Sequence, residues 1–203
     1  MNETTMNTTR AMHKVRPDFA IYHPNGENTG CAFRMNLHPA HDDRDGCIMM
    51  ELANQMSVGN HQGPKPTYAT FNWKGSLAVK LGFSDICKMI QVFRGTLGSL
   101  EGGKGLFHRS ARYMTKICLS HIMEPVDGYL LEIYRNPLQS MQGTNDSSRA
   151  RILLNTWEAL GLSLAFENSI GIVCFGIPKV VTRESAAVGG ESAMGGSRDV
   201  PAA

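Results

Sequence analysis

The sequence predicts an α+β fold in which two antiparallel four-stranded sheets are each followed by a helix. Segments that alternate apolar and polar residues occur in two groups of four, and each group runs into a segment with helical periodicity. Strands connected by hairpins and short loops pair in an antiparallel manner. We therefore expect the order ββββα twice, in a single domain over residues 17–178 with halves at residues 17–97 and 98–178.

Length and composition are those of a globular protein. The chain has 203 residues, of which 42% are hydrophobic, and a formal net charge of +2. A chain of this length buries on the order of 70% of the surface that its unfolded form exposes, so it can form one large core. No uninterrupted apolar run approaches the ~20 residues needed to cross a bilayer, and we expect no membrane segment. A small net charge neither requires nor excludes a nucleic-acid partner, because it can conceal one basic face.

Three strands open the first half. We expect them at residues 17–22, 31–39 and 47–53. In the second strand, Arg34 and His38 fall on the polar face because side chains alternate across a strand. The dipeptide at residues 45–46, Asp-Gly, is a strong hairpin signal between the second and third strands.

A fourth strand then runs directly into the first helix. The alternation from Trp73 to Leu81 predicts a half-buried strand with Lys74 and Lys80 on its solvent face. Ser84 is expected to cap the helix. Its apolar stripe is formed by Ile86, Met89, Ile90, Phe93 and Leu97.

The second half repeats this order after a glycine-rich loop. A short segment at residues 106–112 is followed by strands at residues 115–125, 129–137 and 149–154. Asn155 or Thr156 is expected to cap the second helix. This helix is apolar nearly all the way round, which predicts burial under its own sheet or against another subunit.

Both ends of the chain have the composition of flexible segments. Residues 1–16 are expected to form a disordered arm, and residues 179–203 a tail rich in glycine, serine and alanine. The arm lacks the apolar segment of a secretion signal. The five cysteines are widely spaced and form no CxxC pair, so we expect buried free thiols in a reducing compartment.

The order of the predicted elements and several local strings resemble the Whirly family of single-stranded-DNA-binding proteins. The resemblance covers roughly residues 18–178, and the strings that carry it are FAIYHP, NLHPAHDDRDGCIMMELA, FNWKGSLAVKLGFSDICKMIQVFRG, GKGLFHRS with KICLSHIMEPVDGYLLEI, and NTWEALGLSLAFENSIGIVCFG. It implies two sheets packed like whirligig blades and a homotetramer joined through the helices. It also implies single-stranded DNA bound along the sheet edges with little sequence preference.

One string departs from the family pattern. Plant members carry KGKAAL in the second strand, where this chain reads TGCAFRMNL and has neither lysine. The departure favours a more distant prokaryotic or phage relative over a plant organellar protein. We therefore expect the cytoplasm of a bacterium or of a phage-infected cell, with an organellar transit peptide at the N-terminus as the alternative.

Binding of a single strand requires cations along the phosphates and flat apolar groups on which bases stack. Basic and aromatic residues are interleaved in several predicted strands and loops. The candidate nucleic-acid-binding residues are Arg34, His38, Phe71, Trp73, Lys74, Lys80, Lys104, Phe107, His108, Arg109, Arg112, Tyr134, Arg149 and Arg151. The segment 104–112 is the strongest group, because a glycine-rich loop precedes it.

An enzyme or a metal site has weaker support in the sequence. His38, His41 and Asp42 could bind a metal ion, but a proline interrupts the element between the histidines and the following residues are typical of a solvated turn. The chain contains no nucleophile elbow, P-loop, GxGxxG fingerprint or HExxH motif. We predict no cofactor, no metal and no catalytic activity.

The sequence thus predicts a protein that binds single-stranded DNA in replication, recombination or repair. Three alternatives remain open on the same fold. One is an RNA-binding or annealing protein, the second is a transcription coactivator, and the third is a protein-interaction tetramer whose basic residues only keep the surface soluble.

Overall fold

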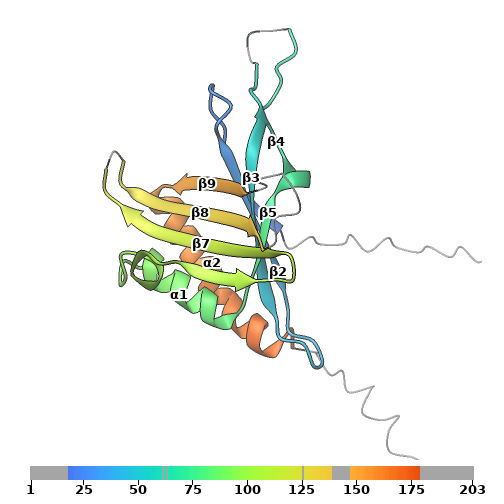
Figure 1. Cartoon of the computed structure of the whole chain (residues 1–203), viewed down its shortest axis with the longest axis vertical. Coiled ribbons are helices and arrows are strands. Elements are labelled where there is room, and N and C mark those ends of the chain that lie inside the picture. Colours follow the sequence, from blue (N-terminus) through green and yellow to red (C-terminus); the bar gives the residue numbers. More distant parts are fainter. Residues whose placement is uncertain (1–17, 61, 63, 125, 139–146, 179–203) are drawn as a thin grey trace, which may run out of the picture.

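The computed structural model describes residues 18–60, 62, 64–124, 126–138 and 147–178. The predicted arm at residues 1–16 and the predicted tail at residues 179–203 lie outside the described residues. Within the described part of the chain, two antiparallel sheets and two α-helices form the fold (Figure 1). The α+β class, with two antiparallel sheets each followed by a helix, is as predicted.

The first sheet contains one more strand than the sequence predicts. Its strands are β1 (Asp18–His23), β2 (Cys31–His38), β3 (Cys47–Ser57), β4 (Thr70–Phe71) and β5 (Leu77–Leu81). Strand β3 is long enough to pair with β2 along one edge and with both β4 and β5 along the other. The predicted fourth strand is therefore divided between two short strands.

The continuous strand predicted from Trp73 to Leu81 is wrong at its beginning. Trp73–Gly75 forms a short 3-10 helix, η1, between β4 and β5. The Asn72 side chain caps this turn, because its Oδ1 accepts a hydrogen bond from the Gly75 backbone N–H at 3.0 Å. Local capping by asparagine outweighs the alternation of apolar residues at this position.

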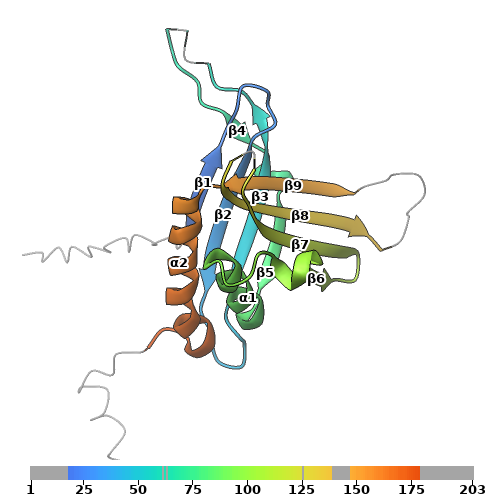
Figure 2. The ribbon, with the colours of Figure 1, turned by 90° about the vertical axis from the view of Figure 1, so that its left-hand side faces the viewer.

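The second sheet is a four-stranded meander, as predicted. Its strands are β6 (Leu106–Arg109), β7 (Tyr113–Ile122), β8 (Gly128–Pro137) and β9 (Ser148–Leu154), paired in chain order. A short turn of 3-10 helix, η2 (Leu100–Gly103), precedes β6. In Figure 2 the strands of the first sheet run nearly vertically and those of the second nearly horizontally, so the two sheets cross.

Helix α1 (Phe83–Phe93) is shorter than the predicted stripe. Ile86, Met89, Ile90 and Phe93 are buried as expected, but Leu97 lies beyond the end of the helix and is 45% exposed. The helix is capped by Gly82 rather than Ser84, since the Gly82 backbone N–H donates to the Asp85 carboxylate at 3.2 Å.

Helix α2 (Thr156–Phe175) buries only one of its two apolar faces. Asn155 caps it, as predicted, by accepting a hydrogen bond from the Glu158 backbone N–H at 2.9 Å. Its buried face consists of Ala159, Leu162, Ser163, Phe166, Ser169 and Val173. The opposite face leaves Trp157, Leu160, Leu164 and Phe175 exposed.

By length and composition alone, α2 is the one helix among the described residues that could cross a membrane, with a mean hydropathy of 1.3. One face of this helix packs into the core of the domain. The Phe166 ring contacts the ring of Phe93 on α1 at a centroid distance of 6.0 Å, and Glu167 receives two hydrogen bonds from Arg94. The helix is therefore part of the folded domain.

Helix α2 also holds the two halves of the chain together. Near its end, the Ile172 and Val173 carbonyls accept hydrogen bonds from the Ala40 and Gly46 backbone N–H groups, both at 3.1 Å. These donors belong to the connection between β2 and β3. The last helix thus completes the first sheet's hairpin.

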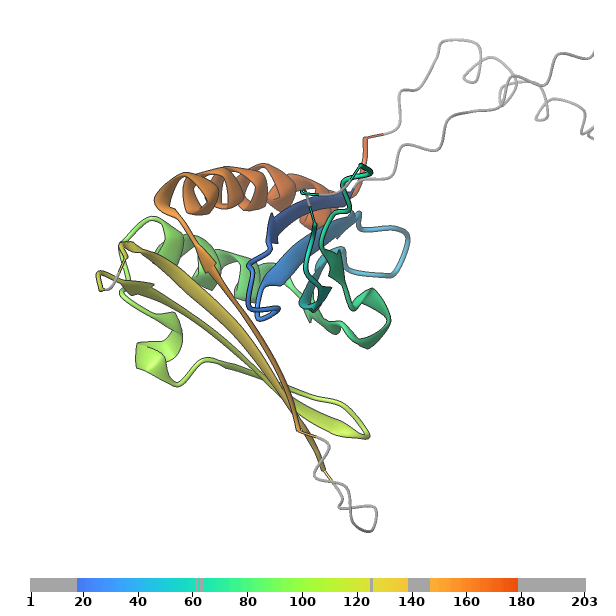
Figure 3. The same ribbon diagram turned by 90° about the horizontal axis from the view of Figure 1, so that it is seen from above.

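A single core lies between the sheets and the helices. Helices α1 and α2 run side by side, and the second sheet lies beneath them in Figure 3. The largest fully buried side chains come from both halves and include Phe33, Met50, Leu52, Ile117, Leu131 and Phe166. Each sheet consequently has an inner face toward this core and an outer face away from it.

Candidate nucleic-acid interface

The outer face of the second sheet carries a row of alternating aromatic and basic side chains. Strand pairing places Phe107 opposite Lys116, Lys116 opposite Tyr134, and Tyr134 opposite Arg149. Directly paired residues project from the same side of an antiparallel sheet. The four side chains therefore form one line across β6, β7, β8 and β9, which we call the aromatic–basic row.

Contacts within the aromatic–basic row orient its members. The Lys116 Nζ lies 5.7 Å from the centroid of the Phe107 ring, and the Arg149 guanidinium carbon lies 5.0 Å from the centroid of Tyr134. A cation over a ring face is worth about 0.5–1 kcal/mol at exposed sites. The Phe107 side chain remains 59% exposed, so its ring is available to a ligand.

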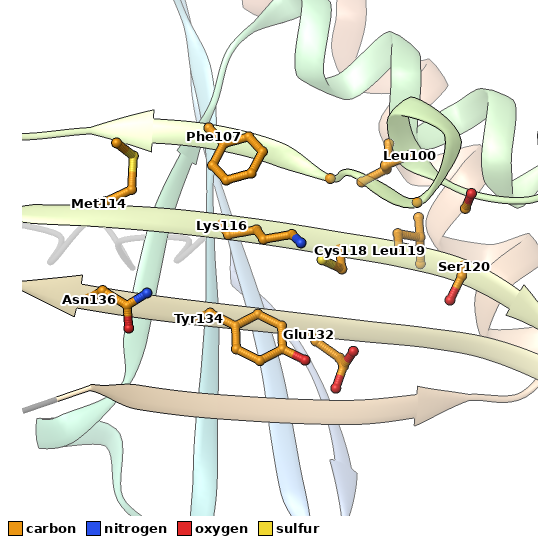
Figure 4. A pocket seen from close by; sticks show the side chains of 13 residues that line it. Leu100, Phe107, Met114, Lys116, Cys118, Leu119, Ser120, Glu132, Tyr134 and Asn136 are labelled. Atoms are coloured by element: carbon orange, nitrogen blue, oxygen red, sulfur yellow. The ribbon is translucent and has the colours of Figure 1, made fainter.

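A hollow of about 450 Å³ lies over this row. Figure 4 shows Phe107, Lys116 and Tyr134 projecting from three neighbouring strands into it, beside Cys118 and Glu132. The loop that contains η2 forms one wall. This loop approaches β7 so closely at Gly105, where φ is +78°, that a Cβ atom would lie 2.5 Å from the Ile117 carbonyl oxygen.

The charge on the second outer face is mostly positive. Arg109, Lys116, Arg149 and Arg151 share it with a single described carboxylate, Glu132. Glu132 forms an ion pair with Arg149. Burial and the Glu132 carboxylate raise the pKa of Tyr134, and burial raises the pKa of Cys118.

The outer face of the first sheet is organised differently. Tyr22 packs against Phe71 and Trp73, with centroid distances of 5.5 and 6.3 Å. Arg34 lies 4.3 Å over the Trp73 ring and donates a 2.8 Å hydrogen bond to Glu51. The rings and the cation on this face are therefore largely engaged with one another.

Ten of the fourteen predicted residues lie on the outer faces, judged by strand pairing and ring contacts. On the second outer face are Phe107, Arg109, Tyr134, Arg149 and Arg151. On the first outer face are Arg34, His38, Phe71, Trp73 and Lys80. The remaining four are Lys74 in η1, Lys104 after η2, Arg112 in the β6–β7 connection and His108 on the inner face of β6.

One predicted placement is wrong, and one candidate lies on the inner face. Lys74 does not share a strand face with Lys80, because η1 interrupts the strand between them. His108 points toward α1, where its Nε2 lies 3.2 Å from the Asp85 carboxylate. The hydrogen bond from His108 is the main reason why the pKa of Asp85 is lowered.

The sequence reasoning missed Lys116, which occupies the centre of the row. Lys116 lies between the inward-facing Thr115 and Ile117 of β7. Its alternation with these buried residues indicated an outward side chain. Its place between Phe107 and Tyr134, however, depends on the register of three strands.

His38, the last residue of β2, and His41, in the connection that follows, do not form a cluster of metal-ligating side chains in the described part of the chain. His38 and His41 are both exposed, and His41 forms an ion pair with Asp42 in the turn. Within the described residues, no group of three or more histidine, cysteine, aspartate or glutamate side chains could hold a metal ion.

The five cysteines are all free thiols, but they are not equally buried. Cys31 and Cys47 are buried as predicted, and burial raises the pKa of Cys31 to about 11. Cys87 and Cys118 are half-buried. Cys174, at the end of α2, is exposed, so the prediction of burial is wrong for that residue.

No protein-family model and no curated protein matches the sequence. Solved structures do match the fold. WHY3 from Arabidopsis thaliana aligns with a TM-score of 0.60 over 87% of this chain and 94% of that chain, at 13% identity. WHY1 from the same plant aligns with a TM-score of 0.58 over 78% and 85%, also at 13% identity. The plant transcriptional regulator PBF-2 aligns with a TM-score of 0.58 over 79% and 83%, at 18% identity. The chain therefore has a Whirly-like fold, as the sequence resemblance implied.

Proposed function

We propose that this protein binds single-stranded DNA, without catalysis and with little dependence on sequence. The observation that carries the proposal is the aromatic–basic row on the second outer face. Base stacking on aromatic side chains contributes about 1–3 kcal/mol per base, and it tolerates any base because every base has a π face. Cations between the rings supply the attraction to phosphate that binding to a single strand also requires.

The spacing of the row suits an unstacked strand rather than a duplex. Phe107 and Tyr134 lie two strands apart, which corresponds to about 10 Å at the usual distance between strands. Stacked bases in a duplex are much closer together. A strand whose bases are spread apart can place one base on each ring while its phosphate passes Lys116.

The exposed face of α2 favours self-association. Trp157 is 79% exposed and Phe175 is 88% exposed, and Leu160 and Leu164 lie between them on the same helix. Exposed apolar patches of this kind commonly mark interfaces. We propose a homotetramer joined through the helices, with α2 at the contact, because a second copy offers the same apolar face. The cellular role we propose is the covering of exposed strands in replication, recombination or repair.

Titration of a fluorescently labelled oligonucleotide tests the binding proposal. We expect binding to a single strand that weakens steeply as salt rises, because phosphate contacts release counterions. Duplex of the same sequence should bind much more weakly. Equal affinity for duplex, or no binding to single strands at low salt, would contradict the proposal.

Three further measurements test the assembly and separate the alternatives. Competition between matched DNA and RNA strands distinguishes a DNA-binding from an RNA-binding protein, because stacking accepts either sugar. Mass measurement in solution tests the assembly, with the variant Trp157→Glu/Leu160→Glu expected to be monomeric.

The likeness to the plant transcriptional regulator PBF-2 keeps a role in transcription as the second candidate. A promoter strand bound no better than an unrelated strand would count against it.

A further inference from the structure

The hollow on the second outer face contains a carboxylate that neither stacking nor phosphate binding explains. Glu132 lies two residues before Tyr134 on β8, and only 13% of its side chain is exposed. In Figure 4 its carboxylate lies beside the Tyr134 ring, within the hollow. It is the one acidic side chain among the described residues that line this hollow. A negative charge there repels phosphate, so this carboxylate does not serve phosphate binding.

Glu132 retains capacity to accept hydrogen bonds. The Arg149 Nη2 donates to its Oε1. An ionised carboxylate has about four acceptor positions on its two oxygens. The Arg149 guanidinium and the Tyr134 hydroxyl together fix the position of the carboxylate and leave its remaining acceptor positions for a ligand.

The Glu132 carboxylate lies at the hydroxyl end of the Tyr134 ring, with which it shares a hydrogen bond (Figure 4). Residues two apart on one strand are separated by about 7 Å and project from the same face. A base stacked on the face of the Tyr134 ring, with its sugar directed away from Glu132, would therefore turn its Watson–Crick edge toward the carboxylate. Unstacked bases in single strands are read through this kind of edge contact.

We propose that Glu132 selects, at one position of the bound strand, a base with hydrogen-bond donors on its Watson–Crick edge, and guanine above the others. This inference rests on the proposed function. Guanine presents two adjacent donors, N1–H and N2–H, which match the two oxygens of a carboxylate. Adenine and cytosine present one amino group beside an acceptor nitrogen. Thymine presents one N–H between two carbonyl oxygens, which a carboxylate repels.

The first test compares bases in an otherwise constant strand. The probes are an all-thymine oligonucleotide and the same oligonucleotide with isolated guanines, measured by fluorescence anisotropy on the full chain. We expect about tenfold tighter binding of the guanine strand, within the range of a good bidentate contact. Inosine, which lacks the N2 amino group, should fall between the two. 7-Deazaguanine, which retains the Watson–Crick edge but disfavours quadruplexes, should behave like guanine.

The second test removes the carboxylate. Glu132→Gln should reduce the preference for guanine to less than about twofold, while affinity for the thymine strand is retained or increased. Glu167→Gln is the matched control, because it breaks an arginine–carboxylate pair with Arg94 on the helices, away from the hollow. This control should keep the full preference.

The outcomes separate the inference from the function on which it rests. If the wild-type protein binds neither strand, the proposed function fails. If it binds the guanine and thymine strands equally, only the base selection fails. If Glu132→Gln keeps the full preference, Glu132 is not the selecting group. Should that variant fold poorly, the comparison of inosine with guanine on the wild-type protein still tests whether donors on the base edge are recognised.

Discussion

The two outer faces use the same kinds of residue to different ends. On the first sheet, Tyr22 packs on other rings and Arg34 is paired with Glu51 over Trp73. On the second sheet, rings and cations alternate across four strands, and Lys116 and Arg151 form no ion pair with other described residues. Composition alone does not distinguish these surfaces.

If the proposed function holds, we expect a cation to contribute most to strand binding where no carboxylate holds it. In the first sheet, a guanidinium that is stacked and ion-paired would have to give up both contacts before it could bind a phosphate. The Arg34 Nε is also buried, and it has no hydrogen-bond partner among the described residues. On the second sheet, Arg149 is stacked on Tyr134 and paired with Glu132 in the same way. Lys116 and Arg151 carry no such ion pair among the described residues, so we expect these two cations to supply most of the affinity.

The largest expected effect comes from reversing two charges on the second outer face. Lys116→Glu/Arg151→Glu should weaken binding of a single strand on the order of 100-fold at moderate salt, because two phosphate contacts become repulsive. The slope of log affinity against log salt should also become shallower by about two phosphate contacts. Anisotropy titrations at several salt concentrations measure both quantities.

The matched variant reverses two charges in the first half of the chain. Lys74→Glu/Lys80→Glu changes the net charge equally, and both lysines are exposed. We expect a loss of no more than about tenfold, from the change in overall charge. Equal losses for the two double variants would show that affinity follows overall charge and not the cations of the second outer face.

A smaller effect is expected from truncating one exposed ring. Phe107 on edge strand β6 is 59% exposed, and Phe19 on edge strand β1 is 50% exposed. Phe107→Ala should weaken binding about tenfold through lost stacking, whereas Phe19→Ala should leave affinity nearly unchanged. Thermal melts of both variants would show whether either change acts through stability instead.

The support beneath edge strand β6 can be tested by pH. Because His108 lowers the pKa of Asp85, this carboxylate stabilises the fold fully above its unfolded pKa near 4, and the contribution is lost as pH falls through the folded pKa. Asp85→Asn should reduce the free energy of unfolding by about 1 kcal/mol at neutral pH, and the two proteins should converge below about pH 3. Urea denaturation at a series of pH values measures this.

The control for this variant is Asp127→Asn in the β7–β8 hairpin. Asp127 also pairs with a histidine, His121, but its side chain is 60% exposed. An exposed ion pair contributes little, so a change of a few tenths of a kcal/mol is expected. A larger loss here than at Asp85 would contradict the assignment.

The smallest expected effect is a gain. Glu51→Gln removes the carboxylate that holds Arg34 on the first outer face. We expect affinity for a single strand to rise by about threefold at low salt, because one repulsive charge disappears and a guanidinium is released. No change at any salt concentration would show that the first outer face takes no part in binding.

Much of the fold could be predicted from local signals. Alternation and turn residues placed the strands of the second sheet within a few residues, because a hairpin such as β7–β8 is specified by its own sequence. The division of β4 from β5 could not be predicted in this way, since it depends on one hydrogen bond from Gly75 to Asn72. The prediction that Leu97 belongs to the apolar stripe of α1 was wrong because the helix ends at Phe93, before the apolar pattern does.

Most residues of the candidate site were named from the sequence, but their arrangement on the sheet was not predicted. Phe107 and Arg109 were identified from composition, and their alternation with Leu106 and His108 already separated two faces. Sequence gave no reason to decide which face was covered by α1. Lys116 was missed because its neighbours in the row come from other strands, and the register of those strands is set by connections that carry no such signal.

The contacts between α2 and the β2–β3 connection have a consequence for the order of folding. The backbone N–H groups of residues 40 and 46 are hydrogen-bonded to the carbonyls of residues 172 and 173, so the chain must close a loop of about 130 residues before the β2–β3 connection has all its partners. Long-range closure of this kind slows folding. During synthesis, the first sheet would leave the ribosome well before the helix that finishes it. We expect the nascent first half to depend on chaperones until α2 arrives.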